Sequence, residues 1–243
     1  NPHGTSVTLD MSDFVQDAIN HYVTVTKSDR EPKLAQTPFC PPGSLLASDW
    51  EVVGELEKGC HSVVMKNMWV ARTARPDLIK PCNDLAGHLH KWSRNCDKYI
   101  ARTIGYMKRS KNFTLKGYVG DPLSDCELWL FVDADFCGEV EHTKSTSGCW
   151  LVLVGPNTCY PIAWCGGKQG STARSTTEAE LISLAMGFFK VSIPILDLFD
   201  FILKSMGKPP MHIRVFEDNQ ATIKVIKNGW SPNLGAVGRV HKP

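Results

Sequence analysis

The spacing of apolar residues divides the chain into a helical part and a part rich in strands. In residues 75–92 and 96–110, apolar positions recur at i, i+3 and i+4, and Lys or Arg occupies the remaining faces. This spacing predicts amphipathic helices. Residues 3–22 predict a short strand and then a helix, which Asp10 or Ser12 can cap. The apolar face of that helix carries Phe14, Val15, Ala18 and Ile19.

Beyond residue 122 the apolar residues form continuous runs instead. Strands are predicted at residues 126–135, 147–155, 160–165 and 211–218. Helices are predicted at residues 174–190 and 219–229, and a second helix that Pro194 kinks or begins follows the first of these. Gly229 can end the last helix. The order of these elements predicts an α/β fold in which a mixed sheet carries packed helices.

The segment 111–122 contains three turn-prone spots and is interpreted as the boundary between two domains, residues 1–116 and 117–243. The charge changes across it. Residues 66–116 hold twelve Lys or Arg against three Asp, a net charge of +9, whereas residues 117–217 hold seven against twelve Asp or Glu, a net charge of −5. A basic part joined to an acidic one suggests that the first binds a polyanion and the second gathers metal ions. Long surface helices that simply carry lysines are the alternative.

The cysteines and the apolar segments bear on the compartment. Nine cysteines are scattered without opposed C-x-x-C pairs, which predicts free thiols in a reducing compartment. The most apolar window, residues 181–203, includes Lys190, Pro194, Asp197 and Asp200, so it predicts a pair of core helices rather than a membrane span. The chain has neither an initial Met nor a signal peptide, and we expect it to be a fragment of a longer protein.

Three pairs of acidic residues fall at the ends of predicted elements. The pairs are Asp133 and Asp135, Glu178 and Glu180, and Glu217 and Asp218. Structural interpretations exist, because Glu178 has capping-box spacing to Ser175, Asp218 can cap the last helix and Asp135 can begin a turn. Sites in open α/β sheets gather at strand ends, so the pairs can also converge. Packed carboxylates repel one another unless cations neutralise them, and no His/Cys ligand set accompanies them. The pattern therefore favours Mg²⁺ or Mn²⁺ and phosphate chemistry over zinc.

Three sequence segments carry a family resemblance. Residues 132–155 ("VDADFCGEVEHTKSTSGCWLVLVG"), 162–185 ("IAWCGGKQGSTARSTTEAELISLA") and 215–229 ("VFEDNQATIKVIKNG") resemble the ribonuclease H domain of copia-type LTR retrotransposon Pol polyproteins. Upstream, residues 7–19, 37–39 and 71–115 are similar to the end of the same family's reverse transcriptase. The resemblance implies a ribonuclease H-like mixed sheet with packed helices, preceded by a mostly helical thumb or connection segment of the polymerase.

The resemblance also implies the site residues. One carboxylate each from the first strand, the first helix and the fourth strand forms a two-metal site, and these match Asp133, Glu180 and Asp218. Glu180 matches the family position better than Glu178, which the capping box already engages. Asp135 lies on the same strand face as Asp133 and is interpreted as an outer partner.

The implied reaction is hydrolysis of the RNA strand of an RNA–DNA hybrid. Two Mg²⁺ or Mn²⁺ ions roughly 4 Å apart would hold the phosphate, with Asp133 bridging both. The basic helices would contact the hybrid's phosphates, and Arg102, Lys108, Arg109 and Lys111 are the candidate residues. The implied partners are the hybrid and the rest of the Pol polyprotein, without a membrane. The implied location is intracellular, either in cytoplasmic virus-like particles or in the nucleus.

Two departures from the family leave alternatives open. The family site uses a fourth acid just beyond a segment with a His, whereas this chain reaches His241 and ends at Pro243 without an acid nearby, which predicts a fold truncated at its C-terminus. The catalytic Asp pair of the polymerase is not in the chain, so no polymerase active site is expected. The alternative functions are a catalytically inactive nucleic-acid-binding remnant of the polyprotein and a fragment of a decayed element that does not fold.

Overall fold

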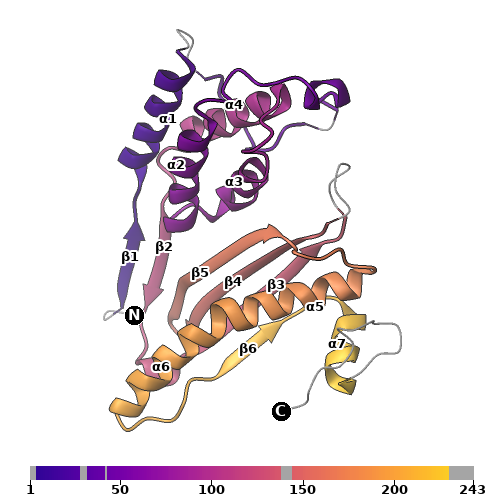
Figure 1. Cartoon of the computed structure of the whole chain (residues 1–243). Helices are drawn as coiled ribbons and strands as arrows, with labels where there is room; N and C mark the ends of the chain where they lie inside the picture. The colour runs from indigo at the N-terminus through magenta and orange to yellow at the C-terminus, as the bar shows by residue number, and fades with distance from the viewer. Residues whose placement is uncertain (1–3, 28–31, 42, 138–143, 230–243) are drawn as a thin grey trace. The chain divides into compact units, whose positions relative to one another are not determined.

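A computed structural model describes residues 4–27, 32–41, 43–137 and 144–229 (Figure 1). They form two compact units, which we call the helical unit (residues 8–115) and the sheet unit (residues 4–7 and 116–229). The division falls within the turn-prone segment 111–122, but part of that segment is itself a strand, β2 (Leu115–Val119).

The helical unit is built from four α-helices that pack on one another around an apolar core. The helices are α1 (Ser12–Thr26), α2 (Cys60–Thr73), α3 (Ile79–Ala86) and α4 (Arg94–Arg109), with short 3-10 helices η1 (Ala47–Trp50) and η2 (Pro76–Leu78). The predicted face of α1 is buried at Val15, Ala18 and Ile19. Asp10 precedes this helix and its Oδ1 accepts the N–H of Ser12 at 2.8 Å. The helix predicted at residues 75–92 corresponds to α3, which is shorter and ends at Ala86.

The sheet has six strands in the order β1-β2-β5-β4-β3-β6. Besides β2, the strands are β1 (Thr5–Leu9), β3 (Glu127–Asp135), β4 (Thr146–Gly155), β5 (Thr158–Lys168) and β6 (Ile213–Phe216). Strands β3, β4 and β5 form an antiparallel meander, and β6 pairs with β3 in parallel. A mixed sheet with helices packed on it is the α/β architecture that the sequence predicts, and it is consistent with a ribonuclease H-like fold.

The alternation of side chains along β3 gives the sheet two different faces. Leu128, Leu130 and Val132 are buried in the main core, together with Leu151 and Leu153 of β4. The intervening residues point to the other face, since successive strand residues alternate. That face carries aromatic rings, including Phe131 and Phe216, which stack with their centroids 4.6 Å apart. By the same alternation, the candidate site residue Asp133 lies on this aromatic face, near the carboxyl end of β3.

One continuous helical stretch covers the core face of the sheet (Figure 1). It consists of α5 (Thr176–Met186), a π-helical segment η4 (Gly187–Ser192) and α6 (Ile193–Ser205). The two predicted helices are present as α5 and α6, and the second begins at Pro194 as predicted, but the π-helical segment that joins them without a break was not predicted. Pro194 lies in the first turn of α6, where a missing N–H is tolerated, and the wider π-helical turns lead into it. A Cβ at Gly187 would come within 2.9 Å of the Val132 side chain, so glycine permits the helix to approach the sheet.

This stretch, Thr176–Ser205, is also long and apolar enough to cross a membrane by length and composition. Its residues Leu184, Phe188, Ile195 and Phe199 pack against the buried face of the sheet. One face of the stretch packs on the sheet, whereas only 22% of its most apolar 18-residue window is buried. These contacts agree with the sequence interpretation for the sheet-facing side of the helix.

The cysteines depart from the prediction of free thiols at one place. Cys149 of β4 and Cys165 of β5 form a disulfide, with their Cα atoms 5.2 Å apart. They are directly opposite each other in the antiparallel ladder. The spacing along the sequence does not reveal this pair, because the register of two strands brings it together. The seven other described cysteines are free thiols, and four of them are buried.

Candidate metal centre

The ends of the two parallel strands place two carboxylates side by side. Phe131 of β3 pairs with Phe216 of β6. Two residues further along lie Asp133, in β3, and Asp218, just after β6. Parallel strands run in the same direction, so their carboxyl ends meet at one edge of the sheet. Both aspartates are exposed at this edge.

The start of α5 separates the roles of its two glutamates. Ser175 caps the helix, because its Oγ accepts the N–H of Glu178 at 3.2 Å. The Glu178 carboxylate turns back and accepts the N–H of Arg174 at 2.7 Å. Glu178 is thus engaged in capping, as the sequence predicts. Glu180, two residues further along the helix, is 6% exposed and points toward the strand ends.

Two polar residues that the sequence analysis did not identify hold α5 against the sheet. Ser183 lies one turn after Glu180, and its Oγ donates a hydrogen bond to the backbone oxygen of Asp133 at 2.7 Å. Gln169 is buried and its Nε2 donates to the backbone oxygen of Ala179 at 2.8 Å. A serine within the apolar stripe of a helix was the available signal for the first of these. The Ser183 bond ties α5 to β3, the strand that carries Asp133, and the Gln169 bond ties α5 to the end of β5.

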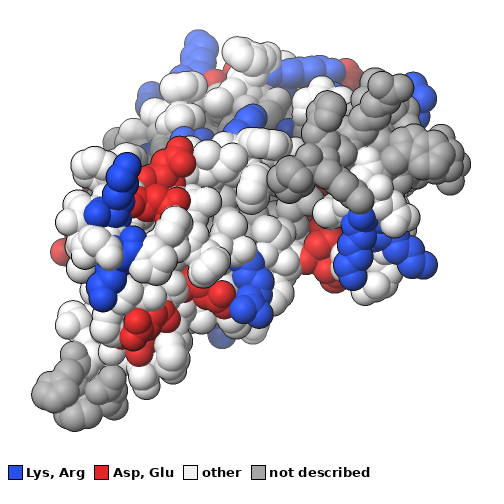
Figure 2. All heavy atoms as spheres, turned by 90° about the horizontal axis from the view of Figure 1, so that it is seen from below, with Lys and Arg blue, Asp and Glu red and all other residues white. Residues whose placement is uncertain are grey.

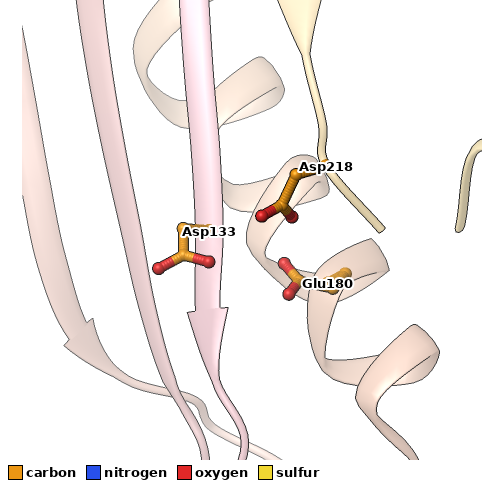
Figure 3. Close-up of side chains that lie close together, drawn as sticks. All are labelled: Asp133, Glu180 and Asp218. Atoms are coloured by element: carbon orange, nitrogen blue, oxygen red, sulfur yellow. The ribbon is translucent and has the colours of Figure 1, made fainter. Parts of the chain in front are cut away.

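Asp133, Glu180 and Asp218 converge although they are far apart in the sequence (Figure 3). Each offers a carboxylate oxygen, and these oxygens all lie within 4.8 Å of one another. Oxygens bound to one octahedral Mg²⁺ are about 3–4 Å apart, so small side-chain rotations can bring this triad onto a cation. One oxygen of Glu180, Oε2, is buried and has no hydrogen-bond partner among the described residues. A buried carboxylate that lies beside two other acids and has an unpartnered oxygen fits a cation site.

The electrostatics of the triad agree with this geometry. Burial raises the pKa of Glu180 to about 7, and the charges of Glu217, Asp133 and Asp218 contribute to the rise. A backbone hydrogen bond from Ala134 opposes it. Among the described residues, no Lys or Arg forms an ion pair with any of these four acids. The negative charge of the site therefore has no counter-charge in the described part of the chain.

Glu217 is a further acid at this site that the sequence analysis grouped with Asp218 but gave no role. Burial raises the pKa of its carboxyl, and the charges of Asp218 and Asp133 add to the effect. Its half-buried position at the end of β6 was not readable from sequence, since Asp218 is its neighbour and exposed. Asp135 ends β3 in an exposed position and is not one of the three converging acids.

The four predicted nucleic-acid contacts, Arg102, Lys108, Arg109 and Lys111, lie on α4 or just after it. Arg109 is exposed, whereas Lys108 is half-buried. Arg102 donates to the Thr37 hydroxyl at 3.0 Å and Lys111 donates to the Gln16 side chain at 3.2 Å. Arg102 and Lys111 are therefore already hydrogen-bonded within the helical unit.

The basic excess of residues 66–116 is also partly neutralised. Six of its twelve Lys and Arg form ion pairs, which are Lys66–Asp17, Arg75–Asp77, Lys80–Asp84, Lys91–Glu51, Arg94–Asp49 and Lys98–Asp49. The face drawn in Figure 2, seen from below Figure 1, is not of one sign either, since basic groups stand beside acidic ones among uncharged residues. The bare count of +9 overstates the positive charge that a ligand would meet, because several partners lie outside that segment.

Taken together, the fold and the triad define an α/β protein with a candidate hard-cation site at the carboxyl ends of parallel strands. Comparison with known proteins places it more closely. The chain is 32% identical over 111 residues to the Retrovirus-related Pol polyprotein from transposon RE2 of Arabidopsis thaliana, covering 46% of this chain. It is 32% identical over 154 residues to the corresponding polyprotein from transposon RE1 of the same plant, covering 63%. It is 27% identical over 161 residues to the Transposon Ty1-JR1 Gag-Pol polyprotein of Saccharomyces cerevisiae, covering 66%.

The chain is thus homologous to the Pol and Gag-Pol polyproteins of copia-type and Ty1 retrotransposons, which confirms the resemblance at the level of the polyprotein. The matched regions make up 7%, 10% and 9% of these three relatives. No protein-family model matches the chain. The homology therefore identifies the kind of polyprotein, and the role of this short segment has to be argued from its own residues.

Proposed function

We propose that the sheet unit is a ribonuclease H module of a retrotransposon reverse transcriptase, which hydrolyses the RNA strand of RNA–DNA hybrids by a two-metal mechanism. The observation that carries the proposal is the convergence of Asp133, Asp218 and the buried Glu180, whose carboxylate has an unpartnered oxygen, Oε2. A carboxylate in that state is costly unless a cation or a proton neutralises it. Homology to Pol polyproteins supports a nucleic acid as the substrate class.

The cation ligands would be Asp133, Glu180 and Asp218, with Mg²⁺ or Mn²⁺ as the ions, since all the donors are hard oxygens. Bound cations would activate a water molecule and stabilise the leaving oxygen of the scissile phosphate. Asp133 and Asp218 are exposed, so the phosphate can approach from their side. Without cations the four acids would repel a phosphate, so binding of the hybrid and of the ions should be coupled.

The chain's own residues keep the acids in place. Ser183 ties α5 to the backbone of Asp133 itself, and it also donates to the backbone oxygen of Gly148 at 3.2 Å. Gln169 adds a second tie to α5 through Ala179. Rigid support of this kind holds ligands near their bound positions before the ion arrives.

The helical unit is proposed to be the thumb or connection segment of the reverse transcriptase. Its exposed Arg109, with Lys108, would contact the hybrid's phosphates. The predicted truncation concerns residues 230–243, which lie outside the described residues. The proposed partners are the hybrid and the rest of the polyprotein, and an intracellular location, in virus-like particles or the nucleus, stays a prediction.

The test is cleavage of an RNA–DNA hybrid, labelled on its RNA strand, by the whole chain in Mg²⁺. We expect Asp133→Asn to lower the cleavage rate by about 100-fold or more, a loss of about 3 kcal/mol of transition-state stabilisation. Glu178→Gln is the matched control, because its carboxylate serves only the helix cap, and it should retain nearly full activity.

Equal cleavage by wild type and Asp133→Asn would contradict the proposal. Hybrid binding that weakens with salt, without any cleavage by the wild type, would favour the inactive remnant instead. Binding is therefore measured for the same samples, at two salt concentrations, alongside the cleavage rate.

A further inference from the structure

One pair of cysteines in the sheet unit has no part in the proposed hydrolysis. Cys149 of β4 and Cys165 of β5 stand opposite each other in the antiparallel ladder and are joined by a disulfide. Both belong to the core face of the sheet, where Cys149 is buried and Cys165 is half-buried. The seven other described cysteines are free thiols. Because Cys165 is only half-buried, a small thiol can reach the pair from its side.

The disulfide lies next to the hydrogen bonds that hold α5 on the sheet. Cys149 follows Gly148 in β4, and it pairs with Val132, the residue before Asp133. The Ser183 hydroxyl of α5 bonds to the backbone oxygens of both Asp133 and Gly148, at 2.7 and 3.2 Å. A displacement of Cys149 therefore acts on the anchor that keeps α5, the helix with the third acid of the triad, beside Asp133.

The helical stretch that carries Glu180 also packs directly on the disulfide. A Cβ at Gly187 would lie 3.2 Å from the Cβ of Cys149 and 2.9 Å from the Val132 side chain. Glu180 and Gly187 belong to this one stretch, about two turns apart. Two unbonded sulfur atoms need more space than a disulfide, because van der Waals contact replaces a covalent bond. Close-packed interiors transmit such a change, so separated sulfurs press on the helix of Glu180.

The exchange that opens the pair needs only a dithiol. A thiolate of dithiothreitol attacks one sulfur, the S–S bond between Cys149 and Cys165 breaks, and the other sulfur leaves as a thiolate. The second thiol of the reagent then closes a ring disulfide, so the two cysteines together gain two electrons and two protons. Glutathione disulfide reverses the change, because it oxidises the two thiols and is itself reduced to two molecules of glutathione.

We propose that the Cys149–Cys165 pair is a reversible thiol–disulfide site that regulates the triad, so that the disulfide form binds a divalent cation more tightly than the dithiol form. The regulation rests on the proposed function, since it acts through the cation ligands of that site. A cross-link that only stabilises the fold is the competing interpretation. Such a cross-link changes the melting temperature but not the cation affinity of the folded chain.

The experiment compares the whole chain in its two redox forms. One sample is oxidised with glutathione disulfide, the other is reduced with dithiothreitol, and each reagent is then removed without air. Thiol counting in denaturant should give nine thiols for the reduced chain and seven for the oxidised chain. Mn²⁺ binding is measured by electron paramagnetic resonance below the melting temperature of both forms. We expect the dithiol form to bind Mn²⁺ about tenfold more weakly, a usual cost of disturbing the support of a metal ligand.

Single-cysteine variants assign the response to this pair. Cys165→Ala should bind Mn²⁺ with the same affinity after either treatment, because no disulfide can form. If a thermal melt shows that this variant does not fold, Cys149→Ala removes the other half of the pair and the same loss of response is expected. Cys159→Ala is the matched control, since Cys159 is an exposed free thiol on the same strand, and it should keep the full response.

The outcomes distinguish this inference from the function on which it rests. Equal Mn²⁺ affinity in the two wild-type forms would overturn the regulation and leave the metal-dependent function standing. Nine thiols after oxidation, or tighter binding by the dithiol form, would also overturn the regulation alone. An oxidised and a reduced chain that both fail to bind Mn²⁺ would overturn the proposed function together with the regulation.

Discussion

The helical unit and the sheet unit treat buried charge in opposite ways. Four charged side chains are buried among the described residues, and three of them, Asp49, Arg75 and Asp84, lie in the helical unit. Each of these has an opposite charge within hydrogen-bonding distance. Glu180 of the sheet unit is the fourth, and it has no such partner in the described part of the chain.

The pKa shifts of two buried acids, Asp49 and Glu180, illustrate the difference. Lys98 bonds to Asp49 at 2.6 Å, and this contact lowers the pKa of Asp49. Burial and neighbouring acids raise the pKa of Glu180 instead. A paired buried charge helps to define the fold, whereas an unpaired one costs stability and persists where it serves a ligand. Comparing how charges are paired therefore separates structural acids from candidate site acids in this chain.

The largest effect is expected from removing Arg75, one of the paired buried charges of the helical unit. Arg75 is 2% exposed, and it donates to Asp77 and to the backbone oxygen of Ser110 at 2.9 Å. Arg75→Ala removes a large buried side chain, the counter-charge of Asp77 and a donor to Ser110, although Asp77 keeps its hydrogen bond from the Tyr106 hydroxyl. We therefore expect the free energy of unfolding of the helical unit to fall by roughly 3–5 kcal/mol. Denaturant titration, in which unfolding is monitored by hydrogen exchange of the α2 and α4 amides, measures the change.

The exposed Arg72 on the same stretch of chain provides the control. Arg72→Ala should change the free energy of unfolding by no more than about 0.5 kcal/mol. A comparable loss in both variants would show that the pairing of Arg75 is not what matters.

The second prediction concerns Glu180, the unpaired buried acid, whose pKa is shifted in the opposite direction to that of Asp49. The folded-state pKa of Glu180 is about 7, above the ordinary value of 4.5, so the folded state holds a proton that the unfolded state releases. Without divalent cations, the free energy of unfolding of the sheet unit should therefore decrease as the pH rises from about 4.5 to about 7, by up to about 3 kcal/mol. Glu180→Gln should remove most of this decrease and be the more stable protein at pH 8.

Hydrogen exchange of β3 and β4 amides in EDTA, at several pH values, measures this effect. Some slope should remain in Glu180→Gln, because the pKa of Glu217 is raised as well. Glu178→Gln should keep the full slope of the wild type. A Glu180→Gln variant with an unchanged slope would refute the assignment of the titration to Glu180.

The smallest expected effect comes from Asp135, which is compared with Asp133 of the same strand, β3. Asp135 is exposed and lies two residues beyond Asp133, outside the triad. We expect Asp135→Asn to change hybrid cleavage and Mg²⁺ affinity by no more than about threefold, or about 0.6 kcal/mol. The same assays on Asp133→Asn set the scale, and similar losses in both variants would move Asp135 into the site.

Local patterns were enough to predict the elements that carry the candidate site. The apolar run before Asp133 predicts β3, the capping spacing of Ser175 and Glu178 predicts the start of α5, and Gly229 predicts the end of α7 (Gln220–Asn228), where its φ is 72°. These signals depend on neighbouring residues alone. They also separated Glu178 from Glu180, since a cap engages the first and leaves the second free.

Other features depended on contacts between distant residues, and the sequence predicted them incompletely or wrongly. The membership of β1 and β2 in the sheet and the pairing of Cys149 with Cys165 follow from strand register. The charge count of the basic segment missed its ion pairs, because residues such as Asp17 and Asp49 lie far from it in sequence.

The sequence by itself determined which acids stand at the ends of β3, α5 and β6, because hydrophobic runs and caps are local properties of the chain. Only the tertiary structure decided that three of them meet within 4.8 Å and that one oxygen of Glu180 is buried without a partner. The parallel register of β3 with β6 and the anchoring of α5 through Ser183 produce that convergence. Burial and counter-charge are properties of the surroundings in space, which neighbouring residues in the sequence do not specify.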